Sequence, residues 1–99
     1  MTIVVMSGIA ASLRGIDAAS DQPGLLAGVD AALDAVRAEL AAHTPALTLA
    51  GAWSEVLRHS VAAAIRVAAP GQPWTWYLSG SVARGEAAPG SDVETMAVL

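Results

Sequence analysis

Two short groups of polar residues near the end of the sequence have the types and the spacing that phosphate chemistry needs. Gly80 and Ser81 are separated by ten residues from Asp92, which is followed by Glu94. Glycine lets the backbone approach a ligand closely, and the N–H groups that open a helix bind anions, with the serine hydroxyl as a further donor. On a strand, residues 92 and 94 project from one face, where a divalent cation such as Mg²⁺ relieves the repulsion between two carboxylates. The pattern therefore predicts metal-assisted phosphoryl or nucleotidyl transfer.

The residues around these groups predict the elements that must position them. Residues 74–80 alternate bulky and small side chains and predict a strand that ends at the Gly-Ser pair. A short helix is expected next, then a turn at residues 89–91 and a second strand over 92–99. Two strands alone leave open sheet edges, which residues 3–6 or a partner chain would cover.

Two amphipathic helices are predicted before the first strand. In the helix expected over residues 24–42, Asp21 is the N-cap and Pro23 lies at the helix start. Its predicted apolar stripe consists of Leu26, Val29, Leu33, Val36 and Leu40. The helix expected over residues 50–69 has a predicted buried stripe of Trp53, Val56, Leu57, Val61, Ala64, Ile65 and Ala68. Residues 14–24 are typical of a loop, and residues 3–13 predict a strand or a short helix on the core.

The composition excludes several classes of protein. Ninety-nine residues predict a single domain, and the absence of cysteine removes disulfides, thiolate zinc sites and thiol catalysis. Five arginines, no lysine and nine acidic residues give a net charge of −4, which offers no general attraction to nucleic acid or to an anionic membrane. The apolar residues 3–13 are too few to span a bilayer and have no basic residue before them, so we expect a cytoplasmic protein without a signal peptide.

Two further groups could carry chemistry but favour a structural interpretation. Glu55 and His59 are one helical turn apart, yet no further metal ligand lies nearby, and a solvated helix face is the preferred interpretation. Trp74 and Trp76 share one face of the predicted strand. Without basic neighbours, a core role is favoured over a platform on which bases stack.

The segment GSVARGEAAPGSDVE resembles the signature of the polymerase-β-like nucleotidyltransferase superfamily. That signature is Gly-Ser, a spacer of about ten residues, and then Asp-x-Asp or Asp-x-Glu. The Ala-Arg-Gly-Glu and Ser-Asp elements are most similar to the minimal bacterial nucleotidyltransferases. They are also similar to the domains related to signal-protein uridylyltransferases, in which a helical stretch precedes the Gly-Ser strand. The resemblance is specific over residues 76–99.

The resemblance implies a role for each residue of the segment. Gly80 and Ser81 would hold the β- and γ-phosphates of a nucleoside triphosphate, Asp92 and Glu94 would bind Mg²⁺, and Arg84 would support the turn or a phosphate. The family also expects a third carboxylate on a later strand, and the five residues after Glu94 contain no acid. We therefore expect a chain that stops after the second carboxylate of a longer domain, and whether it turns over substrate stays open.

The sequence thus predicts an α/β or α+β fold in which two helices precede the strand–helix–strand start of a mixed nucleotidyltransferase sheet. We expect an N-terminal segment over 1–23, a helical segment over 24–71 and the start of the nucleotidyltransferase core over 72–99. The predicted function is Mg²⁺-dependent transfer of a nucleoside monophosphate to a hydroxyl. The alternative is a non-catalytic module that binds nucleotide or contributes its helices to an assembly. The acceptor is expected to be a protein or a small molecule rather than RNA, and association through the open sheet edge or through helix 24–42 is also expected.

Overall fold

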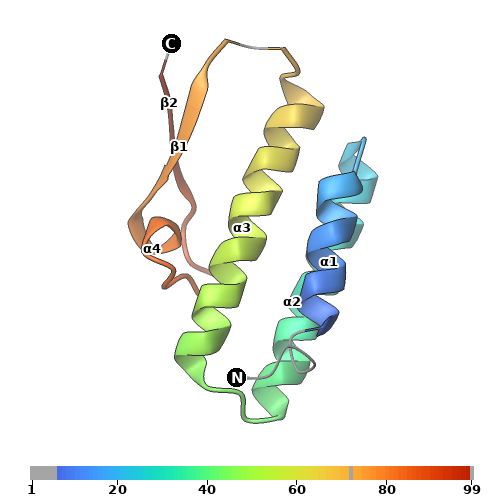
Figure 1. The fold of residues 1–99 in the computed structure, drawn as a ribbon, viewed down its shortest axis with the longest axis vertical. Coiled ribbons are helices and arrows are strands. Elements are labelled where there is room, and N and C mark those ends of the chain that lie inside the picture. Colours follow the sequence, from blue (N-terminus) through green and yellow to red (C-terminus); the bar gives the residue numbers. More distant parts are fainter. Residues whose placement is uncertain (1–6, 72, 99) are drawn as a thin grey trace.

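The chain has an α+β fold in which three long helices precede a two-stranded antiparallel sheet with a short helix between its strands (Figure 1). This fold is that of a computed structural model, which describes residues 7–71 and 73–98. The elements are α1 (Ser7–Ala18), α2 (Gln22–Ala41), α3 (Ala46–Ala68), β1 (Thr75–Ser79), α4 (Gly80–Ala83) and β2 (Glu94–Val98). The α+β class and the strand–helix–strand order are therefore confirmed.

The first helix is the main departure from the sequence predictions. Three long helices precede β1, not two, because residues 14–18 continue α1 instead of forming a loop. Ile9, Ser12 and Ile16 recur at helical spacing and are buried, so packing of this face outweighs the poor helix propensity of the surrounding residues. Residues 3–6, predicted as a third strand, lie outside the described residues.

The second helix begins as its capping residues predict. The Asp21 carboxylate accepts a hydrogen bond of 2.8 Å from the Gly24 amide, and a proline stands in the first turn. The predicted apolar stripe is partly wrong, because Leu26 and Leu40 are 54% and 61% exposed. Small residues form much of the contact instead: a Cβ atom at Gly28 would lie 2.8 Å from the Ile16 side chain, so glycine allows α1 and α2 to approach closely.

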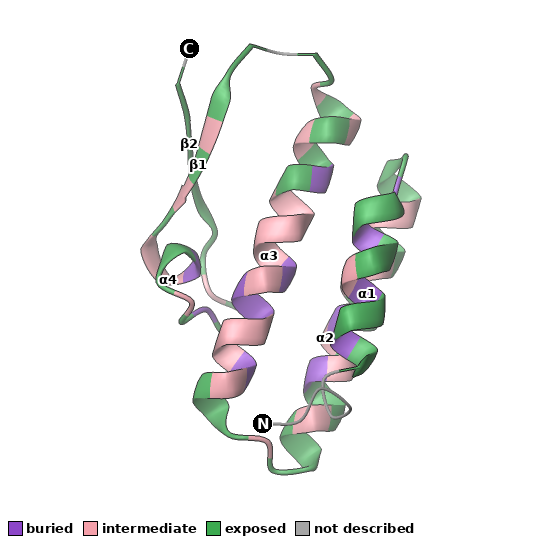
Figure 2. Cartoon of the chain, viewed as in Figure 1, coloured by how far each residue is buried: buried purple, intermediate pink, exposed green. Residues whose placement is uncertain are grey.

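The third helix connects the two parts of the molecule. It begins at Ala46, four residues earlier than predicted, and it contacts α1, α2 and α4. The core residues Trp53, Val56 and Ala63 of α3 are buried, as are Val82 and Ala87 of the segment that follows β1. Figure 2 shows the buried positions gathered where the three long helices face one another. The other predicted stripe residues of α3 are half-buried (Leu57, Val61 and Ile65) or exposed (Ala64 and Ala68).

The two strands form a twisted ribbon beside α3 (Figure 1). The register pairs Thr75 with Val98 at one end and Ser79 with Glu94 at the other. Trp76 is half-buried and lines a cavity of about 280 Å³ against α3, whereas Trp74 is 42% exposed. The predicted core role is therefore wrong for Trp74, whose ring stands at the start of the ribbon. Within the described ranges, no helix is both long enough and apolar enough to cross a membrane.

Candidate functional site

The junction between β1 and α4 brings the two halves of the predicted motif into contact. Gly80 adopts a φ of +65°, in the left-handed region that favours glycine, and turns the chain from strand into helix. The carboxylate of Glu94 lies directly over this glycine: a Cβ atom at position 80 would be 2.9 Å from Glu94 Oε2. The Ser79 hydroxyl donates to the same oxygen over 3.3 Å. A glycine at this position therefore leaves the space that the Glu94 carboxylate occupies.

The first acidic residue of the motif has a different position from the one predicted. β2 begins at Glu94, so Asp92 lies on the irregular segment that precedes the strand, and strand alternation does not place the two carboxylates on one face. The preceding turn is closed by hydrogen bonds from Ser91 N to Ala88 O and from Ala88 N to Ser91 Oγ. This turn brings the chain back toward the Gly-Ser pair and leaves both carboxylate side chains exposed.

The other two predicted ligand-binding residues lie on α4 and just after it. Ser81 is half-buried, and its carbonyl accepts a hydrogen bond of 2.8 Å from the Glu86 amide. Arg84 is exposed, and its Nε donates to Glu86 Oε2 over 3.4 Å. Exposed ion pairs of this kind contribute little free energy, so this contact holds the Arg84 side chain only weakly.

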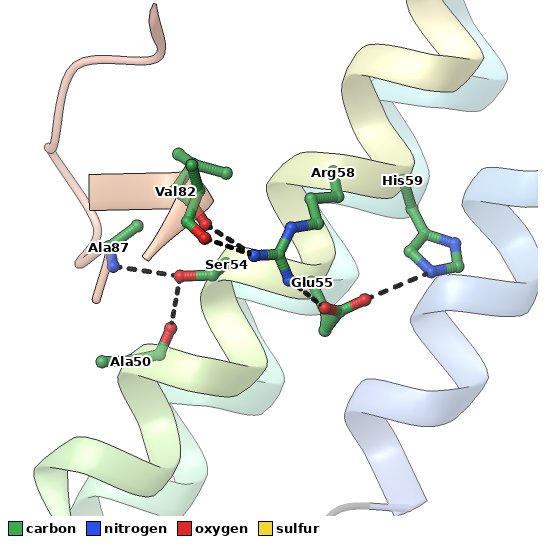
Figure 3. A network of polar contacts seen from close by, with 8 residues as sticks. Ala50, Ser54, Glu55, Arg58, His59, Val82 and Ala87 are labelled. Carbon is green, nitrogen blue, oxygen red and sulfur yellow. Dashed lines mark hydrogen bonds and ion pairs between the residues drawn. The ribbon is translucent and has the colours of Figure 1, made fainter. Parts of the chain in front are cut away.

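Arg58 of α3, which no sequence pattern indicated, attaches α4 to the helical part of the molecule (Figure 3). Its Nη2 donates to the carbonyl oxygens of Val82, over 2.9 Å, and of Ala83, over 3.1 Å. Its Nη1 is ion-paired with Glu55 on the same helix. A cation at these carbonyls is well placed, because the last carbonyls of a helix have no partner within it.

Ser54, one helical turn before Arg58, forms a second connection that sequence analysis missed (Figure 3). The residue is completely buried. Its hydroxyl donates to Ala50 O over 2.8 Å and accepts a hydrogen bond of 3.0 Å from the Ala87 amide. The sequence signal that could have indicated this connection is the position of Ser54 directly after Trp53, which belongs to the predicted buried stripe. Together, Ser54 and Arg58 connect α3 to both ends of the segment 82–87.

His59 connects α3 to α1. Its Nδ1 lies 2.7 Å from Asp17 Oδ1, and its Nε2 lies 3.8 Å from Glu55 Oε2. Across residues 7–71 and 73–98, no group of three or more His, Asp or Glu side chains could hold a metal ion. The preferred interpretation of a solvated helix face holds only in part, because the imidazole contacts a second helix.

An apolar cavity of about 620 Å³ lies beside the segment that joins α4 to β2. Its walls come from the second half of α2, the first half of α3 and residues 87–90. The lining residues are Leu33, Val36, Arg37, Leu40, Ala46, Leu49, Ala50, Ala87, Ala88, Pro89 and Gly90. Residues 87–90, which belong to the ten-residue spacer between Ser81 and Asp92, therefore form part of the wall of this cavity.

Comparison with known proteins supports the resemblance seen in the motif. A family model described as Putative nucleotidyltransferase DUF294 matches residues 31–99, which is more than half of the chain and includes the whole motif. No curated protein and no solved structure matches the chain. The matched range begins within α2 and continues through α3, β1, α4 and β2. The chain therefore belongs to the Putative nucleotidyltransferase DUF294 family.

Proposed function

We propose that this chain provides the nucleotide-binding and metal-binding part of a Mg²⁺-dependent nucleotidyltransferase. The reaction moves a nucleoside monophosphate from a nucleoside triphosphate to an acceptor hydroxyl and releases pyrophosphate. One observation carries the proposal: the Glu94 carboxylate lies on Gly80, so the acidic half of the motif meets the Gly-Ser half in space. Membership of a nucleotidyltransferase family gives independent support.

The chemistry of the side chains fits a magnesium ion held jointly with a substrate. Asp92 and Glu94 are exposed carboxylates, and the Ser79 hydroxyl, at 3.3 Å, leaves the Glu94 oxygens available as ligands. One or two carboxylates together with substrate phosphates are the usual ligands of Mg²⁺ in proteins. Bound there, the ion would supply charge neutralisation for the triphosphate.

The remaining residues of the motif bind and orient the triphosphate in this proposal. Gly80 leaves room for the Glu94 carboxylate and so places this metal ligand next to Ser81, whose hydroxyl donates to phosphate oxygens. Arg84 exchanges its weak contact with Glu86 for a phosphate oxygen. For the acceptor we propose a protein or a small molecule, because a net charge of −4 does not favour RNA.

A calorimetric titration with ATP and UTP, with Mg²⁺ and with a chelator, tests the proposal. We expect binding that needs Mg²⁺ and that Asp92→Asn or Glu94→Gln weakens by roughly tenfold or more, since each removes a charged ligand. Asp30→Asn is the matched control, because it removes the same charge from an exposed position on α2. Equal nucleotide affinity with Mg²⁺ and with the chelator would contradict the proposal. An equal loss of affinity in Asp30→Asn would also contradict it. Binding without pyrophosphate release would identify a nucleotide-binding module that lacks turnover.

A further inference from the structure

We infer that Arg58 is a positioning residue for this site: it fixes the direction of α4, and with it the position of Ser81, relative to the contact between Gly80 and Glu94. The inference rests on the proposed function and adds a residue that lies on α3, outside the motif. Arg58 reaches the carbonyl end of α4, whereas the Gly-Ser pair forms the other end of the same short helix.

The shortness of α4 makes its position depend on contacts with the rest of the molecule. Four residues are far too few for a helix to be stable by itself in water. Two contacts hold it on α3, the completely buried side chain of Val82 and the guanidinium of Arg58. The planar guanidinium has donors in a fixed arrangement, so binding both carbonyls fixes the direction of the helix as well as its distance from α3.

Hydrogen bonds within the turn pass this constraint to the site. The Arg84 amide donates to Gly80 O over 3.2 Å, and the Glu86 amide donates to Ser81 O over 2.8 Å. The carbonyls of both motif residues are therefore tied to the turn whose end Arg58 holds. If that end moves, α4 changes direction at Gly80, and Ser81 is displaced from the Glu94 carboxylate that the strand register holds beside Gly80.

The same helix provides a matched control in Arg66, two turns further along. Its Nη2 donates to the carbonyl oxygens of Ile16, over 3.3 Å, and of Ala19, over 2.9 Å, at the end of α1. Both arginines thus use one guanidinium nitrogen of α3 to bind two carbonyls at the end of another helix. Of the two, only Arg58 binds α4, the helix that begins with the Gly-Ser pair. Arg66→Met therefore removes the same kind of contact without affecting the candidate site.

The test compares Arg58→Met, Arg58→Lys and Arg66→Met in the full chain. Calorimetry measures the affinity for ATP and UTP with Mg²⁺, and hydrogen exchange measures the protection of the Arg84 and Glu86 amides. We expect Arg58→Met to weaken nucleotide affinity and to accelerate this exchange by roughly tenfold each, because two charge-assisted hydrogen bonds are lost. Arg58→Lys keeps the charge but not the planar guanidinium, so it should give intermediate values. Arg66→Met should match the wild type in nucleotide affinity and in the exchange of the two amides.

Each alternative result has a definite meaning. Wild-type affinity in Arg58→Met, or unchanged exchange of the two amides, overturns the positioning role while the proposed function stands. An equal loss of affinity in Arg66→Met also overturns it, because the effect would then be general. If Arg58→Met loses the helical circular dichroism of the wild type, Arg58→Lys decides, and wild-type affinity in that variant rejects the inference. No Mg²⁺-dependent binding by the wild type would instead reject the proposed function, and with it the site that Arg58 positions.

Discussion

The helical part of the molecule and the strand–helix–strand part are stabilised in different ways. The α1–α3 bundle buries apolar side chains from all three helices. In contrast, every residue of β2 is exposed, and β1 alternates between exposed and half-buried positions. The second part is attached to the bundle through two buried residues, Val82 and Ala87, and through polar contacts from α3. The part that bears the candidate site therefore takes its position from the helical bundle.

The largest effect is expected in the bundle. Trp53→Ala removes a large buried side chain of α3 and should lower the free energy of unfolding by about 3–5 kcal/mol. Trp74→Ala, at an exposed position of the ribbon, should change it by less than about 1 kcal/mol. Urea unfolding followed by far-ultraviolet circular dichroism measures both. Similar decreases in the free energy of unfolding for the two variants would contradict the proposed difference in stabilisation between the bundle and the ribbon.

A smaller effect is expected where the two parts are joined. Ser54→Ala leaves the buried Ala87 amide without its acceptor, which should cost about 1–3 kcal/mol of unfolding free energy. Ser60→Ala is the control, because the Ser60 hydroxyl bonds only to the Val56 carbonyl one turn earlier on α3. The same urea titrations apply. If the two serine variants lose the same stability, the contact with Ala87 adds nothing to the attachment.

The smallest effect on stability is expected at Gly80, where a substitution should also reduce nucleotide binding selectively. Gly80→Ala forces a side chain into the left-handed region and against the Glu94 carboxylate, at a cost of about 1–2 kcal/mol. Gly71→Ala carries the backbone strain alone, because its φ is +75° and, among the described residues other than its chain neighbours, no heavy atom lies within 4 Å of the added Cβ. We expect calorimetry to show loss of Mg²⁺-dependent nucleotide binding for Gly80→Ala only. If Gly80→Ala retains Mg²⁺-dependent binding, the contact between Glu94 and Gly80 has no role in nucleotide binding.

Local sequence signals predicted those elements that local chemistry determines. The Asp21 cap and the following proline located the start of α2 to within two residues, and the glycine and proline after α3 located its end. The alternation before Gly80 predicted β1, and the motif itself predicted the short α4. In contrast, α1 was predicted only in part: residues 3–13 were expected as a strand or a short helix, and residues 14–18 as a loop. Burial of Ile9 and Ile16 against the other helices, which no local pattern reports, outweighs the loop-like composition.

The candidate site was predictable as a list of residues but not as an arrangement. The contact between Glu94 and Gly80 follows from the register that pairs Ser79 with Glu94, and composition does not specify register. Arg58 and Ser54 reach backbone atoms 24 to 33 residues away in the sequence, and helical periodicity does not indicate such distant partners. Strand alternation placed Asp92 wrongly because β2 starts two residues later than predicted.

The pairing of Ser79 with Glu94 also has a consequence for the order in which the chain folds. Helices α1, α2 and α3 bury a shared apolar core, so the bundle can be stable without the ribbon. The strands that bring Ser79 and Glu94 together form a ribbon of only two strands with an exposed β2, and α4 has four residues. Because neither element is stable alone in water, the bundle should form first and the motif should assemble last, on a finished helical template.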